Sequence, residues 1–255
     1  MPDPWDPRQY DRFRTERAQP FRDLLALVQP RPGMRVVDLG CGTGDMTLEL
    51  HRELGARETL GIDDSASMLA KVPRAEGLRF EQLDIAKFAP AEPFDLAFSN
   101  AALHWVPDHP SLLRRLTRAL RPGGQLAIQM PMNDDHPSHQ TAFELARSPE
   151  FRRLLHGFER RAELLEPAQY SSWLHKLGFV RQQVRLQIYA HLLESREQVI
   201  EWVRGALLTD YQKRLAPADW ERFLRRYREL LLPQLDDERP FLYTYPRILI
   251  WGELP

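Results

Sequence analysis

Three glycines at alternate positions, Gly40, Gly42 and Gly44, form the stretch best suited to bind a ligand. Residues 36–39, Val-Val-Asp-Leu, precede them with the apolar character of a buried strand, and the periodicity of an amphipathic helix follows. A strand that turns into a helix through glycines exposes bare backbone, on which a ligand can lie. Asp45 stands where the dinucleotide fingerprint G-x-G-x-x-G requires its third glycine. Because its carboxylate would repel a pyrophosphate, the spacing favours a ligand without phosphates.

Polar side chains also lie at or near the ends of the strands that we predict after this turn. Asp63 and Asp84 follow two of them, Asn100 follows a third, and Gln129 lies near the end of a fourth. An acidic residue at the end of a strand can accept hydrogen bonds from two ribose hydroxyls, which is the role we expect for Asp63.

The first 130 residues alternate between strands and helices five times, and the strands are expected at 34–39, 59–62, 78–83, 94–99 and 125–130. This alternation with short connections predicts an α/β fold with a doubly wound parallel sheet. Ligands of such sheets bind at the carboxyl ends of the strands. We therefore expect the glycine turn and the polar residues at strand ends to form one site.

The sequence VVDLGCGTG at 36–44 resembles the first motif of the class I methyltransferases, which use S-adenosylmethionine (SAM). In that family an acidic residue at the position of Asp84 bonds the adenine amino group, and the next apolar residue, here Ile85, covers the ring. The resemblance implies SAM as the cofactor. Its expected binding residues are Asp38, Gly40, Gly42, Asp63, Met68, Asp84, Ile85 and Asn100.

The same resemblance implies a seven-stranded, mostly parallel, Rossmann-like sheet. Two late strands, expected at 179–193 and 241–252, fit the pair that closes such a sheet, one of them antiparallel. The expected organisation is an N-terminal helical lid at 1–30, a SAM-binding core at 31–194, a helical cap inserted at 195–236 and the last strand of the core within 237–255. An amphipathic helix packed on the core is the alternative interpretation of residues 1–30.

Further motifs resemble a narrower family, the trans-aconitate 2-methyltransferases. They are the N-terminal segment from Trp5 to Pro20, the segment NAALHWVPDH at 100–109, QMP at 129–131 with Asn133, and YPR at 245–247. The resemblance implies transfer of the SAM methyl group to a carboxylate oxygen of a small tricarboxylic acid, which gives a monomethyl ester.

A carboxylic acid is ionised at pH 7, so this reaction needs no catalytic base, and orientation of the reacting oxygen is what the protein must supply. Cations and hydrogen-bond donors would hold the other carboxylates, while aromatic side chains keep the pocket dry. The candidate substrate-binding residues are Arg247, Arg17, Tyr10, His104, Trp105, Gln129 and Tyr245.

Other functions stay open at this stage. A carboxyl methyltransferase could act on a different acid, such as a malonyl thioester on a carrier protein, for which the Arg-rich segments 147–161 and 222–228 would offer a basic face. A non-catalytic SAM-binding module is a second alternative, although it would not need the QMP and YPR motifs. An NAD oxidoreductase is least favoured, because Asp45 breaks the fingerprint.

Structural roles compete with the proposed site roles for several residues. Trp105 can be part of the core, Arg247 can be a solvated charge on an edge strand, and Arg17 can pair with a neighbouring acid.

Composition narrows the classes of partner and compartment. The net charge of −1 argues against broad binding of nucleic acid or of an anionic membrane. A single cysteine, Cys41, excludes an internal disulfide and is typical of a reducing compartment. The sequence has no apolar run near the ~20 residues that span a bilayer, and its N-terminus has no apolar signal core. We therefore expect a cytoplasmic enzyme with a small polycarboxylate substrate and no metal ion.

Overall fold

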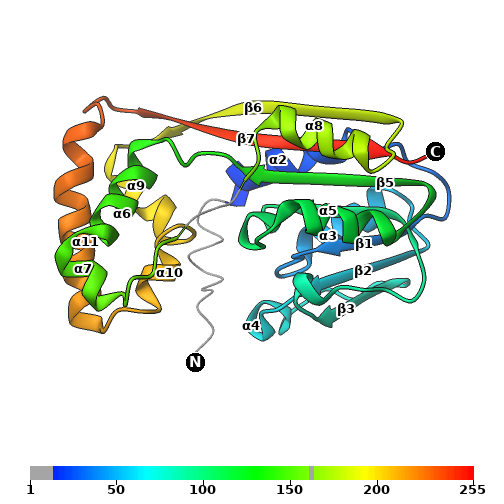
Figure 1. The fold of residues 1–255 in the computed structure, drawn as a ribbon, viewed down its shortest axis with the longest axis horizontal. Coiled ribbons are helices and arrows are strands. Elements are labelled where there is room, and N and C mark those ends of the chain that lie inside the picture. The colour runs from blue at the N-terminus through cyan, green and yellow to red at the C-terminus, as the bar shows by residue number, and fades with distance from the viewer. Residues whose placement is uncertain (1–13, 161–163) are drawn as a thin grey trace. The chain divides into compact units, whose positions relative to one another are not determined.

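The computed structural model describes residues 14–160 and 164–255, which form two compact units (Figure 1). The sheet unit comprises the described residues of 14–132, 163–187 and 246–255. The helical unit comprises those of 133–162 and 188–245. The helical unit thus joins residues 133–160 to the later helices and extends beyond the segment 195–236 that the sequence marks as an insertion.

The described residues form a seven-stranded sheet with the order β3-β2-β1-β4-β5-β7-β6. Neighbouring strands from β3 to β5 are parallel, and β7 runs antiparallel to β5. This arrangement confirms the expected fold class. The strands are β1 (Arg35–Leu39), β2 (Glu58–Asp63), β3 (Leu78–Gln82), β4 (Phe94–Asn100), β5 (Leu120–Pro131), β6 (Arg181–Leu193) and β7 (Phe241–Glu253).

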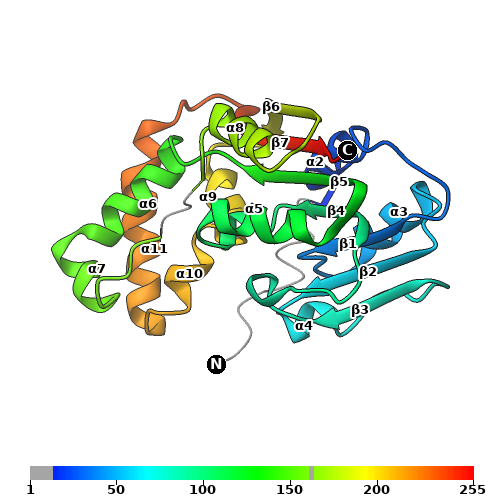
Figure 2. The same cartoon turned by 45° about the vertical axis from the view of Figure 1, so that its right-hand side comes forward.

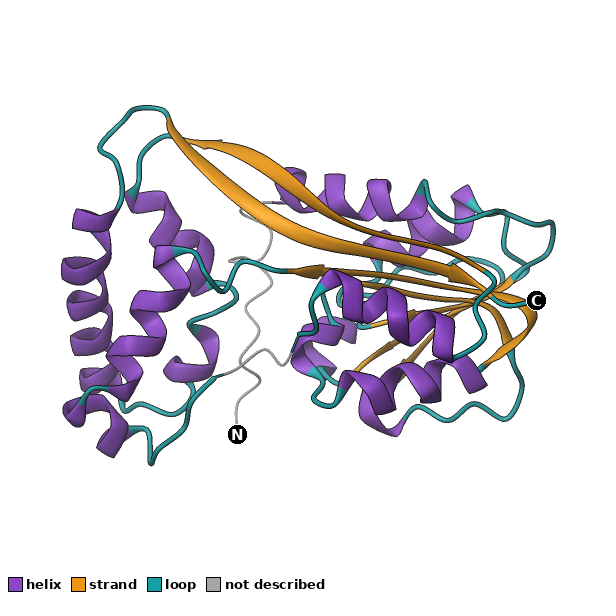
Figure 3. Cartoon of the chain, turned by 45° about the horizontal axis from the view of Figure 1, so that its top comes forward, coloured by secondary structure: helices purple, strands orange, loops and turns teal. Residues whose placement is uncertain are grey.

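Helices cover both faces of the sheet in the sheet unit (Figure 3), because side chains of successive strand residues point to opposite faces. On one face Phe98 of β4 packs against Phe21 at a ring distance of 5.4 Å, in a core that α2 and α3 complete. On the other face Ile128 of β5 shares a core with α5 and α8, which contact each other (Figure 2). The helices of this unit are α2 (Arg14–Leu25), α3 (Asp45–Glu53), α4 (Ala66–Leu69), α5 (His109–Arg118) and α8 (Pro167–Lys176).

The order of the strands indicates at which edge of the sheet a ligand is expected to bind. The chain moves outward from β1 to β3 on one side and from β4 to β5 on the other, so the order reverses between β1 and β4. Ligands of open α/β sheets bind at this reversal, at the carboxyl ends of the strands. Two 3₁₀ turns follow strands here, η1 (Ile85–Lys87) after β3 and η2 (Leu103–Trp105) after β4.

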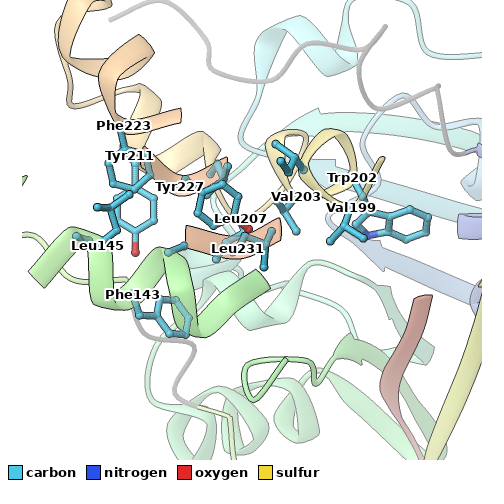
Figure 4. Close-up of a cluster of buried hydrophobic side chains, with 14 of the residues drawn as sticks. Phe143, Leu145, Val199, Trp202, Val203, Leu207, Tyr211, Phe223, Tyr227 and Leu231 are labelled. Carbon is cyan, nitrogen blue, oxygen red and sulfur yellow. The ribbon is translucent and has the colours of Figure 1, made fainter. Parts of the chain in front are cut away.

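The helical unit has a separate apolar core rich in aromatic rings (Figure 4). Trp202, Tyr211, Phe223 and Tyr227 are almost fully buried in it, and the rings of Phe151 and Phe223 meet edge to face at 5.0 Å. Its helices are α6 (Pro137–Arg147), α7 (Pro149–Leu154), α9 (Glu197–Arg204), α10 (Thr209–Gln212) and α11 (Pro217–Leu231), followed by the 3₁₀ turn η3 (Leu232–Gln234).

Candidate active site

The glycine turn is closed on one side and open on the other. The backbone N–H groups of Gly40 and Cys41 both donate to the carbonyl oxygen of Ile62, at 2.8 and 3.0 Å, which ties the turn to β2. Gly40 has a φ of 81°, and a Cβ there would overlap the Cβ of Ala102. Gly42 has a φ of 56°, and a Cβ there would meet no atom of the described residues within 4 Å. The bare backbone predicted from the sequence therefore faces open space at Gly42.

Asp63 is fixed beside this turn by two backbone groups. Its Oδ2 accepts from the N–H of Gly42 at 2.9 Å, and its Oδ1 accepts from the N–H of Ser65 at 3.0 Å. A carboxylate has about four acceptor positions, so the two oxygens can still accept ligand hydroxyls. Ser65 also caps α4 by accepting from the N–H of Met68, whose side chain is buried.

The segment after β3 reaches the same turn. Asp84 caps η1 by accepting from the N–H of Ala86 at 2.8 Å. The half-buried side chain of Ile85 has its Cδ1 3.6 Å from the position of a Cβ on Gly40. Three segments far apart in the sequence thus converge on Gly40: the turn itself, the start of η1, and Ala102 after β4.

Asp38 lies beneath the turn rather than at its surface. Its side chain is buried, and its Oδ2 accepts from Thr47 Oγ1 at 2.7 Å. Burial raises the pKa of Asp38 to about 7; the Thr47 hydrogen bond opposes this rise, and the charge of Asp63 adds to it. Two carboxylates close to the turn favour a cationic ligand over an anionic one.

The stability of the wild type is expected to fall as pH rises, and Asp38→Asn is expected to abolish this fall. Because the folded state holds the Asp38 proton up to about pH 7 while the unfolded chain releases it near pH 4, wild-type stability falls through this window and then levels off. At about 1.4 kcal/mol for each pH unit between the two pKa values, the loss approaches about 4 kcal/mol. Urea denaturation of the ligand-free proteins from pH 4 to 8 measures it. Parallel stability curves for the two proteins would contradict the assignment.

A row of polar side chains, half-buried at Asn100 and buried at Gln129 and Arg247, crosses three neighbouring strands near the carboxyl ends of β4 and β5. In the sheet, Asn100 of β4 is paired with Gln129 of β5, Gln129 with Leu249 of β7, and Pro131 with Arg247. Strand alternation places Gln129 and Arg247 on the face that α2 covers, since Ala127 and Leu249 belong to the core on that face.

The hydrogen-bonding state of this row is its most informative feature. Gln129 is fully buried, and neither its Nε2 nor its Oε1 has a hydrogen-bond partner within the described residues. Asn100 Oδ1 is likewise unpaired there, although Asn100 Nδ2 lies 3.8 Å from Met46 Sδ. Arg247 is only 5% exposed. Buried amides are normally paired, because an unpaired one costs about 1–3 kcal/mol. The amide groups of Asn100 and Gln129 are therefore candidates to contact a polar ligand.

The remaining candidates are distributed over both units. His104 and Trp105 lie together in η2, with ring centroids 4.9 Å apart. Tyr245 belongs to the helical unit, where it is buried and packs against Trp202 at 5.6 Å. The backbone of Arg17 lies in α2. Tyr10 lies outside the described residues.

Two residues of the site were missing from the sequence analysis. Ala102 closes the inner side of the Gly40 turn, and Thr47 holds the carboxylate of Asp38. Ala102 carries no sequence signal that it contacts the turn, because that contact depends on how β4 lies beside β1. No sequence signal distinguishes Thr47 from the other residues of α3.

The part of the chain that the structure describes has neither a metal-binding cluster nor a membrane-spanning helix. Within residues 14–160 and 164–255, no group of three or more His, Cys, Asp or Glu side chains could hold a metal ion. Among the helices of this described part, none is both long and apolar enough to cross a membrane.

Comparison with known proteins identifies the class. A family model described as a methyltransferase domain matches residues 10–184. A trans-aconitate 2-methyltransferase of Deinococcus radiodurans is 43% identical over 98% of this chain and 98% of its own length. One of Methylobacterium nodulans is 40% identical over 96% of each chain. The crystal structure of YcgJ from Bacillus subtilis, 18% identical, covers 93% of this chain and 98% of its own with a TM-score of 0.62, which supports the fold.

The expected enzyme class, a methyltransferase, is therefore confirmed. The matches to these relatives cover 98% and 96% of this chain and so extend over both units. We conclude that the chain belongs to the trans-aconitate 2-methyltransferase family.

Proposed function

We propose that this protein transfers the methyl group of SAM to a carboxylate oxygen of trans-aconitate and produces a monomethyl ester. The observation that carries the proposal is the fully buried amide of Gln129, which has no hydrogen-bond partner among the described residues and lies in one row with Asn100 and Arg247. This row lies within β4, β5 and β7, and β4 is the neighbour of the strand that leads into the glycine turn. The names of the relatives support the choice of substrate.

The residues around the turn fit SAM. The open side at Gly42 accepts a flat nucleoside, the carboxylate of Asp63 can accept from ribose hydroxyls, and Asp84 with Ile85 suits the adenine edge and face. The negative charge of Asp63 suits the ammonium and sulfonium groups of this ligand, and a bound cation would also favour the ionised form of Asp38. When bound, SAM supplies an electrophilic methyl group, and the chain needs no metal or base for its transfer.

The task of the protein is then to hold a polyanion in one orientation. The guanidinium of Arg247 can grip one carboxylate in two-point fashion, which fixes the direction in which another carboxylate points. The amide of Gln129 has a donor NH₂ group and an acceptor oxygen, so it can pair with a carboxylate through the nitrogen and with an ammonium through the oxygen. His104, Trp105, Tyr245, Arg17 and Tyr10 are proposed as further substrate contacts.

Exclusion of water is the second contribution of the chain. The sulfonium of the methyl donor is cationic and the reacting carboxylate is anionic. These two charges disappear as the methyl group moves. A pocket with little water favours this loss of charge, and the rings of His104 and Trp105 are suited to line it.

A methyl-transfer assay with a panel of acids tests the proposal. Trans-aconitate, cis-aconitate, citrate and a malonyl thioester on a carrier protein are offered with SAM, and mass spectrometry detects the ester. We expect the highest kcat/KM with trans-aconitate. A preference for the malonyl thioester would replace trans-aconitate as the substrate, and S-adenosylhomocysteine (SAH) binding without turnover of any acid would indicate a non-catalytic module.

Gln129→Leu is expected to raise stability and lower activity at the same time. Leucine fills a similar volume and removes a buried amide that has no partner within the described residues. Its removal should raise the stability of the ligand-free protein by about 1–3 kcal/mol. The loss of its bonds to charged ligand groups lowers kcat/KM about 10- to 100-fold. Urea denaturation and methyl-transfer kinetics measure the two effects. A destabilised variant with normal kinetics would show that Gln129 serves the core and not the ligand.

The location and partners follow from composition. We propose a cytoplasmic location, because the lone Cys41 is free and buried, as is common where thiols stay reduced. The net charge of −1 supports a small-molecule partner rather than nucleic acid or a membrane. Residues 1–30 as a lid and 195–236 as a cap stay predictions.

A further inference from the structure

One buried histidine connects three segments of the sheet unit. His109, the first residue of α5, has its Nε2 3.2 Å from the carbonyl oxygen of Leu103 and its Nδ1 2.6 Å from the hydroxyl oxygen of Tyr170. Leu103 opens η2, and Tyr170 belongs to α8. His109 is 2% exposed and Tyr170 is fully buried, so water does not compete for these bonds.

The hydrogen-bond partners fix the tautomer of this imidazole. A carbonyl oxygen can only accept, so Nε2 of His109 carries the hydrogen. The oxygen of Tyr170 accepts from the N–H of Leu165 at 3.3 Å, and its own hydroxyl hydrogen is donated to Nδ1 of His109. Burial raises the pKa of Tyr170, which keeps that hydroxyl protonated. The neutral Nε2–H form therefore satisfies every polar atom of the group.

The segment that this pair holds is the loop 101–108 between β4 and α5. It begins and ends with non-glycine residues in the left-handed region, Ala101 at a φ of 54° and Asp108 at 53°. Residues other than glycine adopt this conformation only when surrounding contacts impose it. Ala102 of this loop closes the Gly40 turn, and Trp105 is a proposed substrate contact.

A second bond from α5 reaches η1, the other segment that approaches Gly40. Arg115, nearly two turns after His109, donates from Nη2 to the carbonyl oxygen of Ile85 at 3.4 Å. Ile85 is the proposed adenine contact. One helix, itself fixed to α8 through His109, therefore ties down both segments that converge on Gly40.

We propose that His109 and Tyr170 are positioning residues, which hold the loop 101–108 against the glycine turn and fix the place of Trp105 without touching the ligands. The role of this loop in binding SAM and substrate rests on the proposed function. The hydrogen-bond geometry and the loop conformation do not depend on which acid is methylated.

The test uses the full-length protein labelled with 5-fluorotryptophan. Fluorine NMR reports on Trp105, whose signal is assigned with Trp105→Phe, and calorimetry measures SAH affinity. In Tyr170→Phe we expect the Trp105 signal to shift or broaden while those of Trp202 and Trp220 stay in place. We also expect SAH affinity and kcat/KM each to fall about tenfold.

Tyr227→Phe is the matched control. Its hydroxyl is also fully buried and donates to the carbonyl oxygen of Ser138 at 2.7 Å, but both residues belong to the helical unit, whereas α5 belongs to the sheet unit. It loses a comparable hydrogen bond, so its melting temperature shows what such a loss costs in stability. We expect its Trp105 signal and its SAH affinity to match the wild type.

A series at His109 covers the case in which Tyr170→Phe does not fold. His109→Gln can still donate toward Leu103, whereas His109→Leu cannot, so SAH affinity should decrease from wild type to Gln to Leu. An unchanged Trp105 signal with unchanged SAH affinity, in Tyr170→Phe or in His109→Gln, would overturn the proposal. If both readouts change as expected but the wild type does not methylate trans-aconitate, the positioning role is supported and only the proposed substrate is rejected.

Discussion

Gly40→Ala is expected to weaken SAH binding more than 100-fold. Its Cβ would overlap the Cβ of Ala102, and the backbone φ of 81° is already unfavourable for alanine. Either the turn or the loop after β4 must move, and both border the proposed cofactor site. We expect a stability loss of about 2–5 kcal/mol, the sum of a left-handed residue and an overpacked contact. Calorimetry with SAH and thermal denaturation measure the two effects.

Alanine substitutions at two other glycines distinguish the effect of a blocked ligand contact from the effect of backbone strain. Gly42→Ala introduces a methyl group on the open side of the turn, where it meets no atom of residues 14–160 and 164–255, so we expect weaker SAH binding with a stability loss of only about 1–2 kcal/mol. Gly33 precedes β1, whereas the glycine turn follows that strand. Gly33→Ala imposes similar strain at a φ of 69°, and its methyl group also meets no atom of the described residues. It should leave SAH affinity unchanged. Normal affinity in Gly42→Ala would show that no ligand lies on this face of the turn.

Arg247→Met is expected to lower kcat/KM for trans-aconitate about 10³-fold, with SAH affinity within threefold of the wild type. The side chain is nine-tenths buried on the α2 face of β7, where a guanidinium paired with a carboxylate gains strength from exclusion of water. Loss of one partner of such a buried ionic pair costs about 2–5 kcal/mol, and 10³-fold corresponds to about 4.

Methionine is chosen because it keeps most of the volume and apolar stem of arginine, so the fold should persist. Arg247→Lys is the matched control: it retains the charge but loses the two-point grip, and we expect an intermediate kcat/KM. Steady-state kinetics with trans-aconitate and calorimetry with SAH provide the measurements. Lost SAH binding with an intact fold would move Arg247 to the cofactor site, and unchanged kinetics would make it a structural residue.

The sequence predicted the sheet well because parallel strands produce strong local patterns. The apolar run before Gly40 and the acid after each of the next two strands act within a few residues, whereas β5 begins at Leu120, earlier than the expected 125, and contains Pro122, Gly123 and Gly124. The strand-end position of Asp63 could likewise be predicted, and the structure adds that its carboxylate is fixed by the N–H groups of Gly42 and Ser65.

The site was harder to predict where it depends on contacts between distant segments. The sequence marked Asp38 as a cofactor residue, but only the packed structure shows that it is buried against Thr47 with a raised pKa. The sequence also marked Gln129 as a substrate residue among several, without indicating that its amide lacks a partner within the described residues.

The amino-acid sequence by itself determined the glycine turn, the alternation of strands and helices, and the family, because each is written in residues close together along the chain. The tertiary structure alone decided that Ala102 closes the inner side of the turn, that Asn100, Gln129 and Arg247 form one polar row, and that residues 133–160 share a core with the later helices. These contacts join residues 30 to 120 positions apart. They depend on strand order and on which face each side chain enters, and local periodicity does not specify how distant segments pair.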